Sequence, residues 1–244
     1  MRVLVEPDIE NLSRKAADIV AQLLLVQPQA TLALPTGRTP LGLYRDLARM
    51  HRDEKLDFSR TTVFNLDEYI GVPPSDERSF DHYLRRHLLS RVNVRPENVQ
   101  LHSSTADAAT CADYESRIHS AGGIDLLIAG VGTNGHIAFN EPGAALDSRT
   151  RVVELAESTR SNMLAIFRAD EMPRRAVTVG IATILEARKI LVLATGQAKM
   201  KALAGLVSGP VTIENPVSAV RLHGDVTVLS DMEAAGLSGS SHRS

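Results

Sequence analysis

The segment GVGTNGHIAFNEPG, from Gly130 to Gly143, places a histidine and a glutamate among four glycines, directly after an apolar run. An imidazole exchanges protons near neutral pH, and a nearby carboxylate can fix its tautomer. His136 and Glu141 are therefore candidates for general acid–base chemistry. A histidine bonded to backbone in a rigid turn is the alternative, but the density of glycine, amide and carboxylate groups at a strand end favours a functional role.

The first six residues of this segment also satisfy G-x-G-x-x-G, the fingerprint of a dinucleotide site. Glu154 follows after about twenty residues, where that fingerprint expects an acidic side chain. The fingerprint also requires a helix directly after its third glycine, and Pro142-Gly143 comes too early for more than about two turns. We therefore predict no nicotinamide or flavin cofactor.

A second segment with chemical potential is LPTGRTP, from Leu34 to Pro40, where an expected strand runs into an expected helix. Backbone N–H groups, two hydroxyls, a guanidinium and the positive end of a helix dipole converge there, as in a phosphate cradle. The alternative is a plain turn in which Gly37 supplies an unusual backbone angle and Thr39 caps the helix. No Gly-Lys-Ser/Thr follows, so this is not a Walker loop. The candidate binding residues are Thr36, Gly37, Arg38 and Thr39.

A third segment, FNLDEY from Phe64 to Tyr69, ends an apolar strand in two adjacent carboxylates. Successive strand residues face opposite ways, so Asp67 and Glu68 point into one cleft only if the strand has already ended. One of them is a candidate base. The alternative is that both solvate a loop before the Pro-Pro pair at 73–74. All three segments follow strands, and ligands of open α/β sheets bind outside the carboxyl ends of the strands.

Short β-branched runs alternate with segments of helical period along the chain. This pattern predicts an α/β fold with a doubly wound, mainly parallel, Rossmann-like sheet and helices on both faces. We expect a single three-layer αβα domain over residues 1–235 and a disordered polar tail over 236–244. The expected strands are Arg2 to Val5, Thr31 to Leu34, Thr61 to Asn65, Ile124 to Ala129, Arg151 to Leu155, Ala176 to Val179, Lys189 to Ala194 and Val226 to Leu229.

The expected helices carry start and stop signals. Asp8 can cap a helix that Pro28 stops. Thr39 is expected as the cap of a second helix with Pro40 as its first residue, and Ser79 similarly opens a third. Weaker patterns indicate helices over 107–121, 159–168 and 198–207.

The composition excludes several classes of protein. The 244 residues include 43% hydrophobic ones and carry a formal net charge of -2, so no basic surplus points to nucleic acid. The longest apolar run, IVAQLLLV, is too short to span a bilayer, and we expect no membrane association. The single Cys111 excludes an internal disulfide and favours a reducing compartment, so we expect a cytoplasmic location.

The histidines outside the glycine-rich segment do not form a convincing metal site. His82 and His87 are five residues apart, out of register for a helical metal pair. His223 is expected to be structural, because it lies among apolar residues. The others stand in surface-like contexts: His51, His102, His119 and His242.

Five segments, LPTGRTP, FNLDEY, GVGTNGHIAFNEPG, AVTVGIATIL and LATGQAKM, resemble those of glucosamine-6-phosphate deaminases, in the same order and at similar spacing across nearly the whole chain. GHIAFNEP is the most specific of them. The related 6-phosphogluconolactonases share the fold and the Gly-His element, but there the histidine is typically followed by Thr-Ala-Ser-Leu-Phe-Pro. Glu141 therefore favours the deaminases.

The resemblance implies conversion of glucosamine 6-phosphate and water to fructose 6-phosphate and ammonia, without cofactor or metal. It implies that His136, supported by Glu141 and Asn134, opens the sugar ring. It further implies that Asp67 removes the proton on C2. The phosphate contacts that it implies are at Thr36, Gly37, Arg38, Thr39 and Lys199.

Three departures from the family pattern bear on these roles. Some members carry Asp at the position of Asn134, whose amide cannot accept a proton but can still orient the imidazole. The position of Arg38 is usually small. Members also carry a phosphate-binding Arg near the position of Ala165, which Arg168 or Arg38 could replace. If neither does, the substrate could be another amino-sugar phosphate, such as a galactosamine phosphate.

Allosterically activated members use Ser, Arg and Lys side chains that match Ala144, Arg151 and Val153 here. Two of the three are lost, so the resemblance implies neither activation by an acetylated amino-sugar phosphate nor an allosteric hexamer. We expect a monomer or a small homo-oligomer. Two other functions stay open at this point, namely lactone hydrolysis on the same fold and sugar-phosphate binding without turnover.

Overall fold

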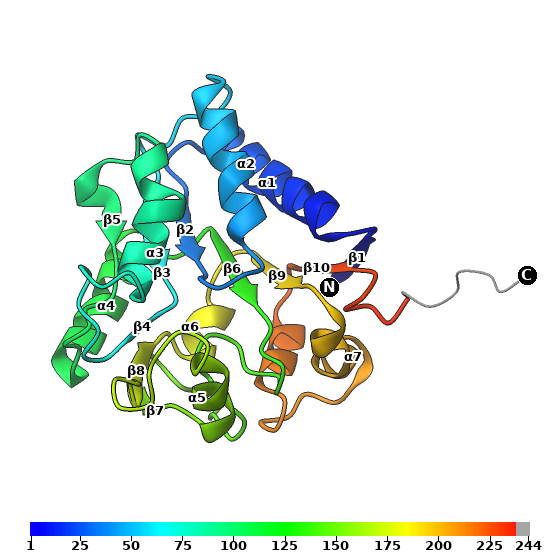
Figure 1. The fold of residues 1–244 in the computed structure, drawn as a ribbon. Helices are drawn as coiled ribbons and strands as arrows, with labels where there is room; N and C mark the ends of the chain where they lie inside the picture. The colour runs from blue at the N-terminus through cyan, green and yellow to red at the C-terminus, as the bar shows by residue number, and fades with distance from the viewer. Residues whose placement is uncertain (238–244) are drawn as a thin grey trace, which may run out of the picture.

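The apolar runs of the chain form a parallel sheet with helices on both faces (Figure 1). The computed structural model describes residues 1–237, and within them this main sheet has seven strands. Every pairing between its strands is parallel. In spatial order the strands are β1 (Arg2–Glu6), β10 (Val226–Asp231), β9 (Ile190–Ala194), β6 (Leu126–Gly130), β2 (Thr31–Leu34), β3 (Thr62–Asn65) and β5 (Val99–Gln100).

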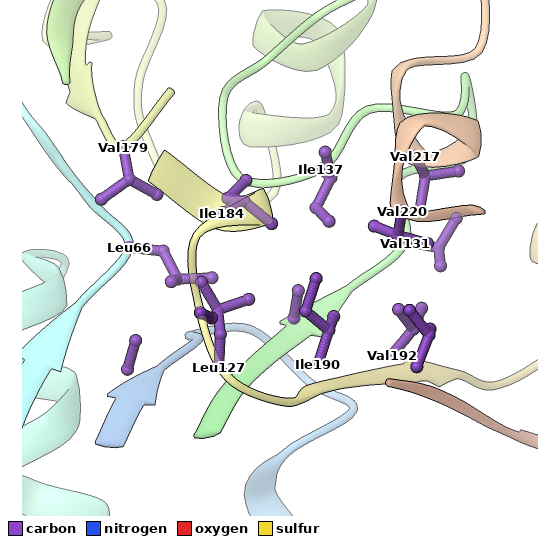
Figure 2. Packing of buried hydrophobic residues seen from close by; sticks show 14 of the residues in the cluster. Leu66, Leu127, Val131, Ile137, Val179, Ile184, Ile190, Val192, Val217 and Val220 are labelled. Atoms are coloured by element: carbon purple, nitrogen blue, oxygen red, sulfur yellow. The ribbon is translucent and has the colours of Figure 1, made fainter. Parts of the chain in front are cut away.

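Alternate strand residues point to opposite faces, which gives the main sheet two cores. On one face Leu32 and Ile128 pack with α1, α2 and α3. On the other, Leu127, Ile190 and Val192 pack with α4, α6, α7 and η4, as Figure 2 shows in part. The predicted three-layer α/β architecture is confirmed. The helices are α1 (Ile9–Val26), α2 (Leu41–Arg52), α3 (Phe80–His87), α4 (Ala108–Ser120), α6 (Ile181–Leu185), α7 (Met200–Ser208) and the 3₁₀ helices η1 (Leu89–Arg91), η2 (Pro96–Asn98), η3 (Gln197–Lys199) and η4 (Pro216–Leu222).

The order of the strands reverses between β2 and β6. The chain continues from β2 to β3 and β5 on one side, and from β6 to β9 and β10 on the other. Loops that leave two such strands diverge, and the crevice between them is where ligands of open α/β sheets bind. The LPTGRTP loop follows β2 and the glycine-rich segment follows β6, so the topology brings these two segments together.

A second sheet of three antiparallel strands lies beside the main one. It contains β4 (Asp67–Tyr69), β8 (Arg175–Thr178) and β7 (Arg151–Glu154), and α5 (Glu157–Met163) follows β7. The sequence predicts β7 and β8 as strands, but not that they form a sheet of their own. It does not predict β4 or the two-residue β5, because strands this short show no periodicity.

The helix starts confirm two predicted caps and correct one. Asp8 Oδ1 accepts the N–H of Asn11 at 2.8 Å in α1, and the Ser79 hydroxyl caps α3. The prediction for Thr39 is wrong, because Pro40 occupies the cap position of α2 and no side chain caps that helix. The Thr39 hydroxyl instead lies 2.9 Å from that of Thr195, at the end of β9.

Two other expectations need correction. His102 is not at the surface but buried, with its ring stacked 3.6 Å from that of Tyr114, and burial lowers the pKa of its imidazole to about 3. Of the predicted tail 236–244, Gly236 and Leu237 belong to a hydrogen-bonded turn after β10. The rest of that predicted tail, with His242, lies outside the described residues.

Candidate active site

A cavity of about 300 Å³ opens at the switch point, beside the carboxyl ends of β2 and β6. Its size lies at the lower end of the range for small-molecule sites. The loop after β2, strand β4, the glycine-rich segment, α5 and the end of η3 all contribute to its wall. The predicted site residues in that wall are Thr36, Gly37, Arg38, Thr39, Asp67, His136 and Lys199.

The loop after β2 is fixed at three points. The Tyr44 hydroxyl donates to the carbonyl of Pro35, and the Tyr83 hydroxyl of α3 donates to the carbonyl of Gly37, each at 2.5 Å. The contact between the Thr39 and Thr195 hydroxyls provides the third point. Gly37 has a φ of 99°, in the left-handed region that favours glycine. These contacts hold the loop against α2, α3 and the end of β9, where its residues line the cavity.

Two residues with cationic side chains contribute to the cavity wall. Arg38 and Lys199 line it, and burial lowers the pKa of the Lys199 ammonium. Arg168 does not line it, since its side chain is 78% exposed and lies 3.6 Å from Asp170. The segment around Ala165 contributes apolar wall instead, through the side chains of Met163 and Ile166. Of the two arginines that the sequence left open, Arg38 is the one in the cavity.

The two carboxylates of β4 face opposite ways, as the alternation of a strand requires. Asp67 lines the cavity, whereas Glu68 points toward α3 and is 1% exposed. Burial, followed by the charge of Glu68, raises the pKa of Asp67 to about 8. Asp67 can therefore both accept and return a proton near neutral pH. The expectation that these residues follow the end of a strand is confirmed, because β3 ends at Asn65, but they also form a short strand of the second sheet, which the sequence does not predict.

His136 and Glu141 lie together beside the cavity, as the sequence predicts. The Nδ1 atom of His136 is 3.4 Å from Oε2 of Glu141, without a hydrogen bond of good geometry in this arrangement. Asn134 bridges the pair. Its Nδ2 donates to Oε2 of Glu141 at 2.8 Å, and its Oδ1 accepts the backbone N–H of His136 at 3.1 Å.

Glu141 is ionised by its surroundings in spite of partial burial. Its Oε1 accepts a hydrogen bond from the hydroxyl of Thr159, in the first turn of α5. Burial acts to raise the pKa of Glu141, but His136, Thr159 and Asn134 together outweigh it and lower that pKa below its usual value. The sequence does not indicate Thr159, because only folding brings α5 against the glycine-rich segment.

Two glycines make room for this arrangement. A Cβ on Gly132 would lie 2.4 Å from the ring of His136, so only glycine leaves space for the imidazole. Gly135 has a φ of 85°, and a Cβ there would lie 2.0 Å from Oδ1 of Asn215. The glycines of the G-x-G-x-x-G pattern thus hold a histidine rather than a helix, and no helix follows them.

No group of three or more His, Cys, Asp and Glu side chains within residues 1–237 is placed to hold a metal ion. In the same part of the chain, none of the helices has the length and apolar character needed to cross a membrane.

Comparison with known proteins gives full-length relatives. A family model described as glucosamine-6-phosphate isomerases/6-phosphogluconolactonase matches residues 7–229. A glucosamine-6-phosphate deaminase of Halothermothrix orenii is 42% identical over 97% of this chain and 100% of its own length. One from Clostridioides difficile is 43% identical over 96% of both chains.

Solved structures of the same family of proteins resemble this chain over nearly its whole length. A structure described as a monomeric glucosamine-6-phosphate deaminase has a TM-score of 0.94 at 41% identity, covering 97% of this chain and 100% of the other. The 6-phosphogluconolactonase of Trypanosoma cruzi has a TM-score of 0.78 at 21% identity, covering 98% of this chain and 97% of the other. At that identity the second likeness shows a shared fold alone.

The space around His136 gives a first prediction. Gly132→Ala should displace the imidazole, because the new Cβ overlaps the ring, and should cost about 1–3 kcal/mol of unfolding free energy as overpacking does. Gly130→Ala is the matched control, since a Cβ there meets no atom within 4 Å. The measurement is the ¹H–¹⁵N resonance pattern of the His136 side chain, together with denaturant unfolding. Equal spectra for the two variants would contradict the role given to Gly132.

Proposed function

This chain belongs to the family of glucosamine-6-phosphate isomerases and 6-phosphogluconolactonases, and we propose that it converts glucosamine 6-phosphate and water to fructose 6-phosphate and ammonia. The observation that carries the proposal is the content of one cavity. A buried carboxylate, Asp67, and a histidine–glutamate pair meet there with two cations, Arg38 and Lys199. These are the groups that proton transfer on a phosphorylated sugar requires.

The first step is opening of the sugar ring. His136 accepts the proton of the anomeric hydroxyl and delivers a proton to the ring oxygen, so that the bond between C1 and that oxygen breaks and an aldehyde forms. The ionised Glu141 stabilises the imidazolium that exists between the two transfers. Asn134 takes no proton in this scheme. Its amide holds Glu141 by donation, which also favours the carboxylate form.

The second step is isomerisation with loss of ammonia. Asp67 removes the proton on C2 while the aldehyde oxygen on C1 takes up a proton, which gives an enolamine, and the proton held by Asp67 is then added at C1. The resulting imine at C2 takes up water, the C2–N bond breaks, and ammonia leaves a ketone behind. A base whose pKa is raised to about 8 by burial and by Glu68 binds a proton strongly enough for this sequence.

The phosphate group is assigned to the other end of the cavity. Arg38 and Lys199 supply positive charge there, and the fixed loop 36–39 supplies backbone N–H groups. This assignment places Arg38 in the role of the arginine that family members carry near the position of Ala165. The identity of the amino sugar rests on the named relatives, and a galactosamine phosphate differs from the proposed substrate by one hydroxyl contact.

The state of assembly and the location rest on different observations. We propose that the chain acts as a monomer, as the solved relative of 41% identity is described, without activation by an acetylated amino-sugar phosphate. Its cytoplasmic location stays a prediction from the single cysteine.

Incubation with glucosamine 6-phosphate should release ammonia and fructose 6-phosphate in equal amounts, detected in parallel. Asp67→Asn should lower kcat about 100- to 10,000-fold, because the amide cannot take the C2 proton. Galactosamine 6-phosphate and 6-phosphogluconolactone serve as comparison substrates. Opening of the lactone without ammonia release from either amino sugar would overturn the proposed function, and ammonia release by Asp67→Asn at the wild-type rate would overturn the assignment of the base.

The phosphate end gives a separate prediction. Arg38→Ala and Lys199→Ala should each raise KM about tenfold or more with a smaller change in kcat, because a hydrogen bond to a charged group contributes about 1.5–3 kcal/mol. Arg168→Ala is the matched control and should leave KM unchanged, since that side chain lies in solvent. A rise in KM for Arg168→Ala with none for Arg38→Ala would reverse the assignment.

A further inference from the structure

Glu68 is a buried carboxylate that the steps above do not use directly. It lies on the side of β4 opposite to Asp67, and its oxygens accept three backbone hydrogen bonds. Oε1 accepts the N–H groups of Tyr69 at 2.8 Å and Phe80 at 3.0 Å, and Oε2 accepts that of Asp81 at 2.8 Å. Two of these donors belong to the first residues of α3. The carboxylate therefore accepts hydrogen bonds from N–H groups that have no partner within the helix, at the positive end of its dipole.

Helix α3 extends this contact to the opposite end of the cavity. Ser79 caps the helix through the N–H of His82, and one residue later the hydroxyl of Tyr83 donates to the carbonyl of Gly37. Glu68 therefore joins the strand that carries Asp67 to the loop 36–39, with α3 as the rigid connector. Helix α3 therefore contacts both the strand that carries Asp67 and the loop that carries Gly37, and Glu68 fastens the helix to that strand.

The two carboxylates of β4 also interact electrically. Two like charges on adjacent buried residues disfavour ionisation of both groups at once, whereas hydrogen bonds donated to a carboxylate favour its ionised form. Glu68 receives three N–H donors, whereas within residues 1–237 no hydrogen bond is donated to the Asp67 carboxylate. As pH rises, the first negative charge is therefore held by Glu68, and the remaining proton by Asp67.

We propose that Glu68 is a positioning residue for the proposed reaction, which fastens β4 to α3 and whose charge makes Asp67 a stronger base than burial alone would. The inference rests on the proposed function, because it assigns a purpose to the proton affinity of Asp67. It adds a residue that never touches the substrate but, next to burial, strengthens the hold of the base on its proton. With a neutral side chain at position 68, Asp67 would lose its proton at a lower pH and would bind the proton transferred from C2 less firmly.

Other charged and titratable groups face the pair and enter its titration. Asp81 on α3 adds negative charge near Glu68, but it is paired with Arg85. Burial raises the pKa of Asp67 and, against the three donors, that of Glu68 to about 7. Tyr44 of α2, Tyr69 of β4 and Tyr114 of α4 are also close enough to interact with the charge of Asp67, and Arg38, His136 and Lys199 share its cavity wall. Arg151 and Arg175 stand on the paired strands β7 and β8.

The test is the pH profile of kcat/KM for glucosamine 6-phosphate, which reports groups of the free enzyme. Wild-type activity should rise with pH through an acidic limb near 8, where Asp67 loses its proton. Glu68→Gln should move that limb down by about one pH unit, because the neighbouring charge is gone. Asp81→Asn is the matched control, since it removes a nearby carboxylate charge that is already paired, and its limb should stay in place. An active Glu68→Gln variant with an unmoved limb overturns the inference.

A second measurement needs neither turnover nor a Glu68 variant. Titration of wild type labelled with ¹³C at the aspartate side-chain carboxyl should show one resonance that moves near pH 8 and is missing from Asp67→Asn. An Asp67 resonance that moves near 4, the usual range for aspartate, overturns the inference even if Glu68→Gln fails to fold. Absence of ammonia release by wild type, with the resonance still moving near pH 8, contradicts the proposed function, and a comparison of this resonance in wild type and Glu68→Gln then tests the charge coupling without turnover.

Discussion

The candidate site depends on how the chain leaves the main sheet after Asn65. The buried amide of Asn65 donates to the backbone carbonyl of Asp67 at 2.7 Å, and its oxygen accepts the N–H of His102 and the hydroxyl of Tyr114. Each of these bonds replaces one to water, so losing one partner would leave a buried polar group unsatisfied. The bend that they fix carries Asp67 out of the main sheet and into β4, on the wall of the cavity.

This bend explains why a buried carboxylate lies in the same cavity as His136. The main sheet alone brings together the segments that follow β2, β6 and β9, which carry Arg38, His136 and Lys199. The second sheet adds Asp67, and α5, which follows that sheet's β7, adds the Thr159 hydroxyl to Glu141. Burial of an unpaired carboxylate destabilises a fold, and the raised pKa of Asp67 reduces that cost because the group can stay protonated in the free enzyme.

The sequence predicts the parts of the site that are local in the chain. The long apolar strands, the glycine-rich segment and the loop 36–39 each consist of consecutive residues, so the sequence pattern predicts their type and position. Contacts made only by folding could not: Thr195 meets Thr39 from another strand, and Thr159 reaches Glu141 from α5. Strand β4 has three residues, too few for a period, and its partner β8 follows more than a hundred residues later. Likewise, only the structure shows that Arg38 lines the cavity and that Arg168 does not.

The role proposed for Asp67, transfer of the proton on C2, is tested most directly with glucosamine 6-phosphate that carries deuterium at C2. We predict that wild type reacts more slowly with this substrate than with the unlabelled one, that part of the label appears at C1 of fructose 6-phosphate, and that Asp67→Asn forms no labelled product. Transfer of the label by Asp67→Asn at the wild-type rate, or ammonia release without breaking the C2–deuterium bond, would contradict it.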